Sequence, residues 1–72
     1  MKKVYKLENL DCANCAAKME RAINKIDGVE AASVNFLTQR LAVEAEESRF
    51  AEIMEAVVKA CRRVEPDCKI LL

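Results

Sequence analysis

The sequence predicts an α+β domain with a ferredoxin-like βαββαβ order, in which two helices cover one face of a four-stranded antiparallel sheet. Three observations predict this fold. Apolar residues alternate with polar ones in four short segments, as in half-buried strands. Two longer segments repeat apolar residues at three- and four-residue intervals, as in amphipathic helices. With 72 residues, one Gly and one Pro, residues 1–72 are expected to form one domain with short connections.

Each element has its own signal in the chain. Tyr5 and Leu7 alternate with charged neighbours in the first strand. Gly28 is expected to end the first helix as a left-handed cap. Ser48 is expected to cap the second helix, and Pro66 prevents its continuation. The expected strands are 3–9, 29–36, 40–45 and 68–72, and the expected helices are 14–26 and 48–63.

Composition excludes several classes of function. The 12 basic and 12 acidic residues give zero net charge, and the chain has three aromatic residues, so no nucleic-acid partner is expected. No apolar run approaches about 18 residues, which argues against membrane insertion of this chain. Nothing resembling a signal peptide follows Met1, so a cytoplasmic location is expected, where thiols stay reduced. The absence of His and of long loops argues against an enzyme acting by itself.

The most informative feature is the pair Cys12 and Cys15, where a strand gives way to a helix. This spacing lets both sulfurs face one ion. Unpaired amides and the positive end of the helix dipole lower thiol pKa values at such a position. Thiolates select soft ions such as Cu(I) and Zn(II) over Mg(II) and Ca(II). The pair therefore predicts reversible metal binding, with dithiol redox exchange as the alternative.

Asp11 stands directly before the first cysteine and is a candidate third ligand. Two thiolates and one carboxylate carry three negative charges, which a monovalent ion neutralises poorly. A divalent ion neutralises them better and prefers more ligands than linear Cu(I). Charge and ligand number thus favour Zn(II), Cd(II) or Pb(II), with water or a partner's ligand in the remaining position. The alternative role of Asp11 is to cap or complement the helix N-terminus.

The whole chain resembles the heavy-metal-associated domains, and the stretch from Leu7 to Ala16 resembles their metal-binding loop. The resemblance implies the βαββαβ fold and metal ligation by Cys12 and Cys15. It also implies a partner, because such domains occur at the cytosolic N-terminus of metal-transporting P-type ATPases and as free metallochaperones. Copper-handling members usually have Gly-Met-Thr or Gly-Met-Ser before the first Cys. Asp11 instead resembles the zinc, cadmium and lead exporters, while Asn9 and Leu10 depart from the Gly-Met pair.

Two further cysteines, Cys61 and Cys68, have two interpretations. Both continue apolar patterns, so the favoured one places them in the core. The strand order, however, brings the connections around Cys12, Leu37 and Pro66 to one end of the domain, and both cysteines lie towards that end. The sharper hypothesis is that one supplies a third sulfur or that they form a second thiol pair. Met19 and Met54 also lie on apolar helical stripes and are interpreted as core residues.

The sequence therefore predicts a module that binds a soft divalent ion and passes it to, or regulates, a metal-exporting P-type ATPase. Three alternatives stay open: a Cu(I) carrier, a dithiol oxidoreductase, and a metal-bridged dimer in which two copies share one ion through facing Cys pairs.

Overall fold

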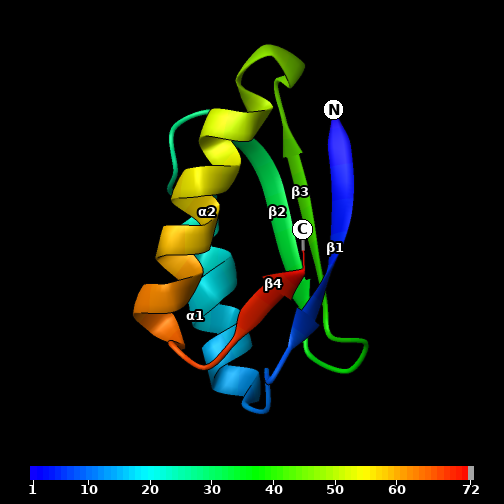
Figure 1. Ribbon diagram of the computed structural model, residues 1–72, viewed down its shortest axis with the longest axis vertical. Coiled ribbons are helices and arrows are strands. Elements are labelled where there is room, and N and C mark those ends of the chain that lie inside the picture. The colour runs from blue at the N-terminus through cyan, green and yellow to red at the C-terminus, as the bar shows by residue number, and fades with distance from the viewer. Residues whose placement is uncertain (72) are drawn as a thin grey trace.

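A computed structural model describes residues 1–71 and shows the predicted order of elements (Figure 1). A four-stranded antiparallel sheet carries both helices on one face, and its strand order is β2-β3-β1-β4. The predicted ferredoxin-like fold is thereby confirmed. In chain order the elements are β1 (Lys2–Glu8), α1 (Ala13–Asn24), β2 (Val29–Asn35), β3 (Arg40–Ala45), a 3-10 turn (Glu47–Arg49), α2 (Phe50–Val64) and β4 (Lys69–Leu71).

Because side chains alternate between the two faces of a strand, every second one packs against the helices. In β3, Leu41, Val43 and Ala45 are fully buried, while Arg40 and Glu44 are exposed. The pairing of β1 with β3 and of β3 with β2 fixes this register because a slip by one residue would turn the apolar set to solvent. The helices complete the core with Met19, Ile23, Phe50, Ile53, Met54, Val57 and Cys61.

Two expected helix boundaries were wrong. Ser48 does not cap α2: it lies inside the 3-10 turn, and α2 begins at Phe50 without a side-chain cap. The turn takes over this role, because the amide of Arg49 bonds the carbonyl of Glu46 at 3.2 Å. α1 ends at Asn24, earlier than expected, and its chain continues in short turns to Gly28.

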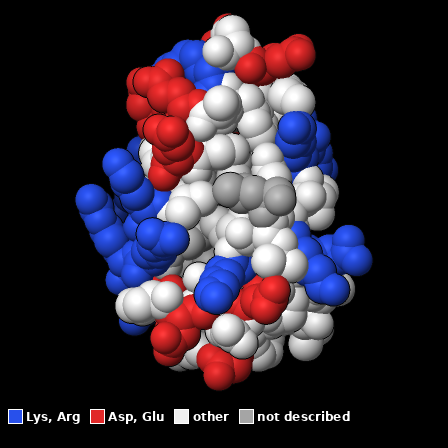
Figure 2. All heavy atoms as spheres, in the orientation of Figure 1, with Lys and Arg blue, Asp and Glu red and all other residues white. Residues whose placement is uncertain are grey.

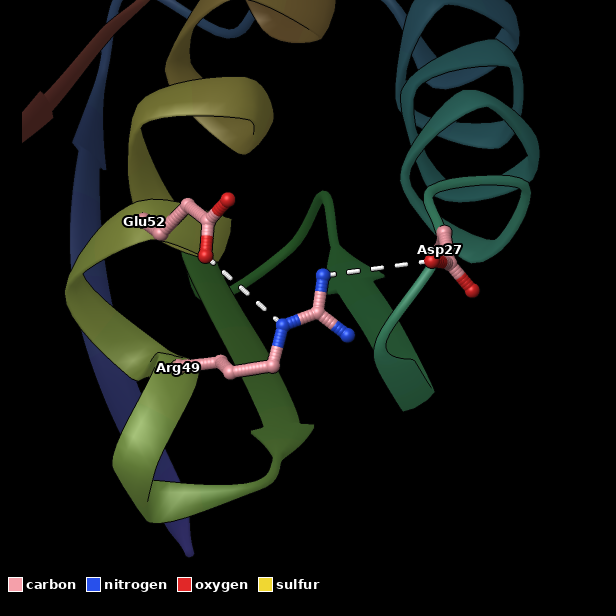
Figure 3. Close-up of polar contacts among 3 residues, drawn as sticks. All are labelled: Asp27, Arg49 and Glu52. Carbon is pink, nitrogen blue, oxygen red and sulfur yellow. Dashed lines mark ion pairs between the residues drawn. The ribbon is translucent and has the colours of Figure 1, made fainter.

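Gly28 is needed for the turn after α1, although not as the cap residue. Its φ is +98°, in the left-handed region that L side chains rarely adopt. A Cβ atom at this position would lie 2.8 Å from Cδ1 of Ile53. Nearby, Arg49 reaches Asp27 at 3.8 Å and Glu52 at 3.7 Å, which ties the start of α2 to this turn (Figure 3).

The opposite end of the domain carries three connections, as the strand order predicts. The segments from β1 to α1, from β2 to β3 and from α2 to β4 lie together at the lower end in Figure 1. β4 covers residues 69–71, so Cys68 precedes the strand and does not belong to it. Leu72, expected in this strand, lies outside the described residues. At this end of the domain, Cys12 and Cys15 therefore lie near residues that are distant in sequence.

Candidate metal centre

Cys12 is the N-cap of α1, so the capping role considered for Asp11 was wrong. The backbone of Cys12 is extended (φ −135°, ψ 119°), and its Sγ accepts a hydrogen bond from the amide of Cys15 at 3.4 Å. The amide of Ala16 bonds the carbonyl of Cys12 at 3.1 Å, so the helix begins directly at the loop. Both cysteines are half-buried and free of disulfide bonds. A thiol thus occupies the position in which Ser or Asp usually caps a helix.

The two thiols of this pair have unequal acidities. The hydrogen bond from Cys15 lowers the pKa of Cys12, and the amides of Cys15 and Asn14 act in the same direction. Partial burial and the charge of Asp11 oppose this shift. The pKa of Cys15 is raised to about 11, first by its hydrogen bond to Cys12, then by burial, the Cys12 charge and Glu65. Cys12 is therefore the more acidic thiol of the pair, and Cys15 is the less acidic one.

Glu65 belongs to this site, and sequence reasoning missed it. It is the C-cap of α2, and the thiol of Cys15 donates to its Oε2 at 3.6 Å. Its position is fixed by backbone bonds from its own amide to Cys61 (2.9 Å) and from the Cys68 amide to its carbonyl (3.1 Å). The available signal was its place in the connection around Pro66, which the strand order brings to the Cys12 end.

Asp11 is exposed and lies with Glu65 and Asp67 at the edge of a polar hollow of about 520 Å³. Lys69 is the only basic side chain among the residues that line this hollow. Within residues 1–71, no three Cys, Asp or Glu side chains form a group that could hold a metal ion together. A third ligand would therefore have to reach the Cys12–Cys15 pair by rotating a side chain.

The other cysteines lie where the core interpretation predicts. Cys61 and Cys68 are 1% and 4% exposed and pack in the hydrophobic core. Burial raises the pKa of Cys61 to about 12, and the neighbouring Cys68 adds to this shift. Burial likewise raises the pKa of Cys68, with a further contribution from Glu65. Met19 and Met54 are core residues too, as expected.

Asn9 and Leu10 stand where the copper-handling domains usually have Gly-Met, and the conformation of the loop accommodates both residues. Asn9 has φ +64°, a left-handed conformation that Asn tolerates better than most residues. Leu10 is 2% exposed and anchors the loop in the core. Together they let the chain leave β1 sharply and present residues 11–15 at the surface.

The groove between α1 and α2 is basic, unlike the hollow beside Asp11. Its volume is about 630 Å³, and its lining includes Lys18, Arg21, Lys25, Lys59 and Arg63 but no acidic residue. In Figure 2, basic side chains gather on the left over the helices, and acidic side chains lie at both the upper and the lower end of this face. Neither helix within residues 1–71 has the length and apolar character that crossing a bilayer requires.

Comparisons with known proteins agree with this geometry. Residues 4–63 match the model of the heavy-metal-associated domain. The chain is 33% identical over 66 residues to the cadmium, zinc and cobalt-transporting ATPase of Bacillus subtilis, covering 92% of this chain and 9% of that protein. It is 39% identical over 57 residues to the copper-exporting P-type ATPase of the same organism, covering 76% and 7%.

Among solved structures, the CopZ metallochaperone superposes with a TM-score of 0.78 at 24% identity, covering 99% of this chain and 100% of that one. This likeness shows the fold. The chain spans less than a tenth of the length of the ATPases that it matches. The matched region contains the cysteine loop, α1, β2 and β3 together with most of β1 and α2, and the chain belongs to the heavy-metal-associated domain family.

Proposed function

We propose that this chain binds one soft divalent ion, Zn(II), Cd(II) or Pb(II), through Cys12 and Cys15 with help from Asp11. It then delivers the ion to a P-type metal-exporting ATPase or, as part of one, regulates its transport. The observation that best supports this proposal is the Cys12–Cys15 pair at the start of α1, where a helix amide donates to the sulfur of Cys12 and carboxylates lie nearby. Soft sulfur ligands suit these ions.

The surroundings of the pair support a divalent ion over a monovalent one. Besides Asp11, the structure adds Glu65, whose carboxylate already contacts the thiol of Cys15. Negative charge around a dithiolate favours a cation of higher charge, because each added carboxylate increases the attraction in proportion to that charge. Relatives named as cadmium and zinc transporters agree with this preference.

The site is also suited to transfer. Two half-buried sulfurs at a surface loop leave open positions on an ion, so an incoming partner thiolate can bind before a Cys12 or Cys15 bond breaks. The proton on Cys15 must leave for the solvent when metal binds, and the thiol lies in hydrogen-bond contact with the carboxylate of Glu65. Stepwise exchange of thiolates would then carry the ion between partners without releasing it to water.

Competitive titration of the reduced domain with Cd(II), Zn(II), Pb(II) and Cu(I), followed by thiolate-to-metal absorbance, tests the proposal. Tight one-to-one binding of a divalent ion is expected. Asp11→Ala should weaken Cd(II) binding by roughly tenfold, the equivalent of about 1.4 kcal/mol, and Cu(I) binding by much less. Asp67→Ala is the matched control, because it removes a charge at the same hollow. Equal losses for Cd(II) and Cu(I) in Asp11→Ala would contradict the ligand role of Asp11.

A Cu(I) carrier is the second candidate, favoured by the match to a copper-exporting ATPase. Preference for Cu(I), unchanged by Asp11→Ala, would support it. One ion per two chains would indicate a metal-bridged dimer. Reduction of insulin disulfides at a rate that depends on Cys12 would instead support the dithiol redox function.

A further inference from the structure

The turn between β2 and β3 reaches across the end of the domain to the cysteine loop. Gln39 lies in this turn and contacts Leu10, which is 29 residues away in the chain. The amide of Leu10 donates to Oε1 of Gln39 at 3.1 Å, and Nε2 of Gln39 donates to the carbonyl of Leu10. One side chain thus pairs both backbone groups of one loop residue, much as a neighbouring strand would.

Gln39 is itself held firmly in place. Its Nε2 also donates to the carbonyl of Phe36 at 3.0 Å, and its own carbonyl accepts from the amide of Leu7 at 2.7 Å. Its backbone is left-handed, with φ +55°, which directs the turn back towards β1. The side chain is half-buried, so these bonds are partly shielded from water. The turn therefore presents a fixed amide to the loop.

The position of this contact gives it consequences for the metal site. β1 ends at Glu8 and α1 begins at Ala13, so residues 9–12 lie outside regular elements. Leu10 is anchored by its side chain in the core and by its backbone on Gln39. Cys12 follows two residues later, and its Sγ accepts from the amide of Cys15, so the segment that Leu10 anchors leads directly to the cysteine pair.

We propose that Gln39 is a positioning residue of the metal site, an inference that rests on the proposed function. It orders the cysteine loop before the ion arrives, so binding does not have to order the loop itself. Fixing one or two backbone residues in advance is worth roughly a tenfold change in affinity. We expect the higher affinity to come from slower dissociation of the ion, because a loosened loop lets Cys12 leave the ion more often.

Gln39→Met tests the proposal, because Met keeps the length and the apolar stem but cannot form the two bonds to Leu10. The probe is Cd(II) alone, chased from the reduced domain into excess chelator. Dissociation should be about tenfold faster than in the unmodified chain. In the metal-free protein, hydrogen exchange at the Leu10 and Cys15 amides should accelerate as well. Gln39→Ala serves as the second variant if the Met variant does not fold.

Arg49→Ala is the matched control for general destabilisation. It removes two ion pairs at the far end of the domain from the cysteine loop (Figure 3). Dissociation of Cd(II) and exchange at Leu10 and Cys15 should not change in this variant. Unchanged dissociation and exchange in Gln39→Met, or equal acceleration in Arg49→Ala, would overturn the positioning role. If the unmodified chain binds none of the divalent ions, the proposed function fails, while amide exchange still decides whether Gln39 orders the loop.

Discussion

The two cysteine pairs of this domain lie towards the same end but in opposite environments. Cys12 and Cys15 are half-buried at a helix N-terminus, where hydrogen bonds from the Cys15 thiol and amide lower the pKa of Cys12. Cys61 and Cys68 are enclosed by apolar side chains, and burial raises the pKa of each thiol. The comparison shows that access and local hydrogen bonding, not the presence of two thiols, decide which pair is suited to bind metal.

Removal of the half-buried pair, Cys12 and Cys15, should have the largest effect. In the double variant Cys12→Ser, Cys15→Ser, we expect Cd(II) affinity to fall by roughly 100-fold or more, because hydroxyl groups are poor ligands for soft ions. Stability should change by less than about 0.5 kcal/mol, since Ser is a good N-cap and both sites are half-buried. Metal titration and urea unfolding of the metal-free protein measure the two quantities.

Cys61→Ala is the control for this prediction, because it removes a thiol of the buried pair. It should keep the Cd(II) affinity while losing about 1 kcal/mol or more of stability. A loss of affinity similar to that of the double variant would show that the buried pair takes part in binding, and would break the distinction between the pairs.

Cys61, in the buried pair, should make the free energy of unfolding depend on pH in the alkaline range. The pKa of Cys61 is about 12 in the fold, against an ordinary value of 9.0. The unfolded chain therefore loses this proton first, and the stability that Cys61 contributes falls as pH rises above about 9. Between pH 8 and pH 10 the loss should be about 1.4 kcal/mol. Urea unfolding under reducing conditions at both pH values measures it.

Cys61→Ala again isolates the contribution, because Tyr5 and the other thiols titrate in both proteins. The free energy of unfolding of the unmodified protein, minus that of Cys61→Ala, should fall by about 1.4 kcal/mol from pH 8 to pH 10. A difference that stays constant would mean that the pKa of Cys61 is the same in the folded and unfolded protein.

Most of the fold could be predicted because its signals are local. Alternation identified the strands, helical periodicity identified α1 and α2, and their order implied the sheet topology. The Ser48 cap failed because a 3-10 turn satisfied the same backbone groups, an outcome that residue preference alone does not distinguish.

The site was only partly predictable for a related reason. Cys12 and Cys15 carry a local motif, whereas Glu65 and Gln39 contact the loop from 50 and 29 residues away. Their residue types carry no signal of their own, since Glu and Gln are common at surfaces. The strand order indicated which connections would meet, but the particular side chains that touch depend on the packed backbone.

The smallest expected effect is a difference in reactivity between Cys12 and Cys15. At neutral pH, Cys12 should be alkylated by iodoacetamide roughly fivefold faster than Cys15, because its larger thiolate fraction outweighs the lower nucleophilicity that accompanies a lower pKa. Peptide mapping after brief labelling measures the ratio. Glu65→Gln should narrow it, since the charge of Glu65 raises the pKa of Cys15. Faster labelling of Cys15 would show that Cys15, and not Cys12, is the more reactive thiol of the pair.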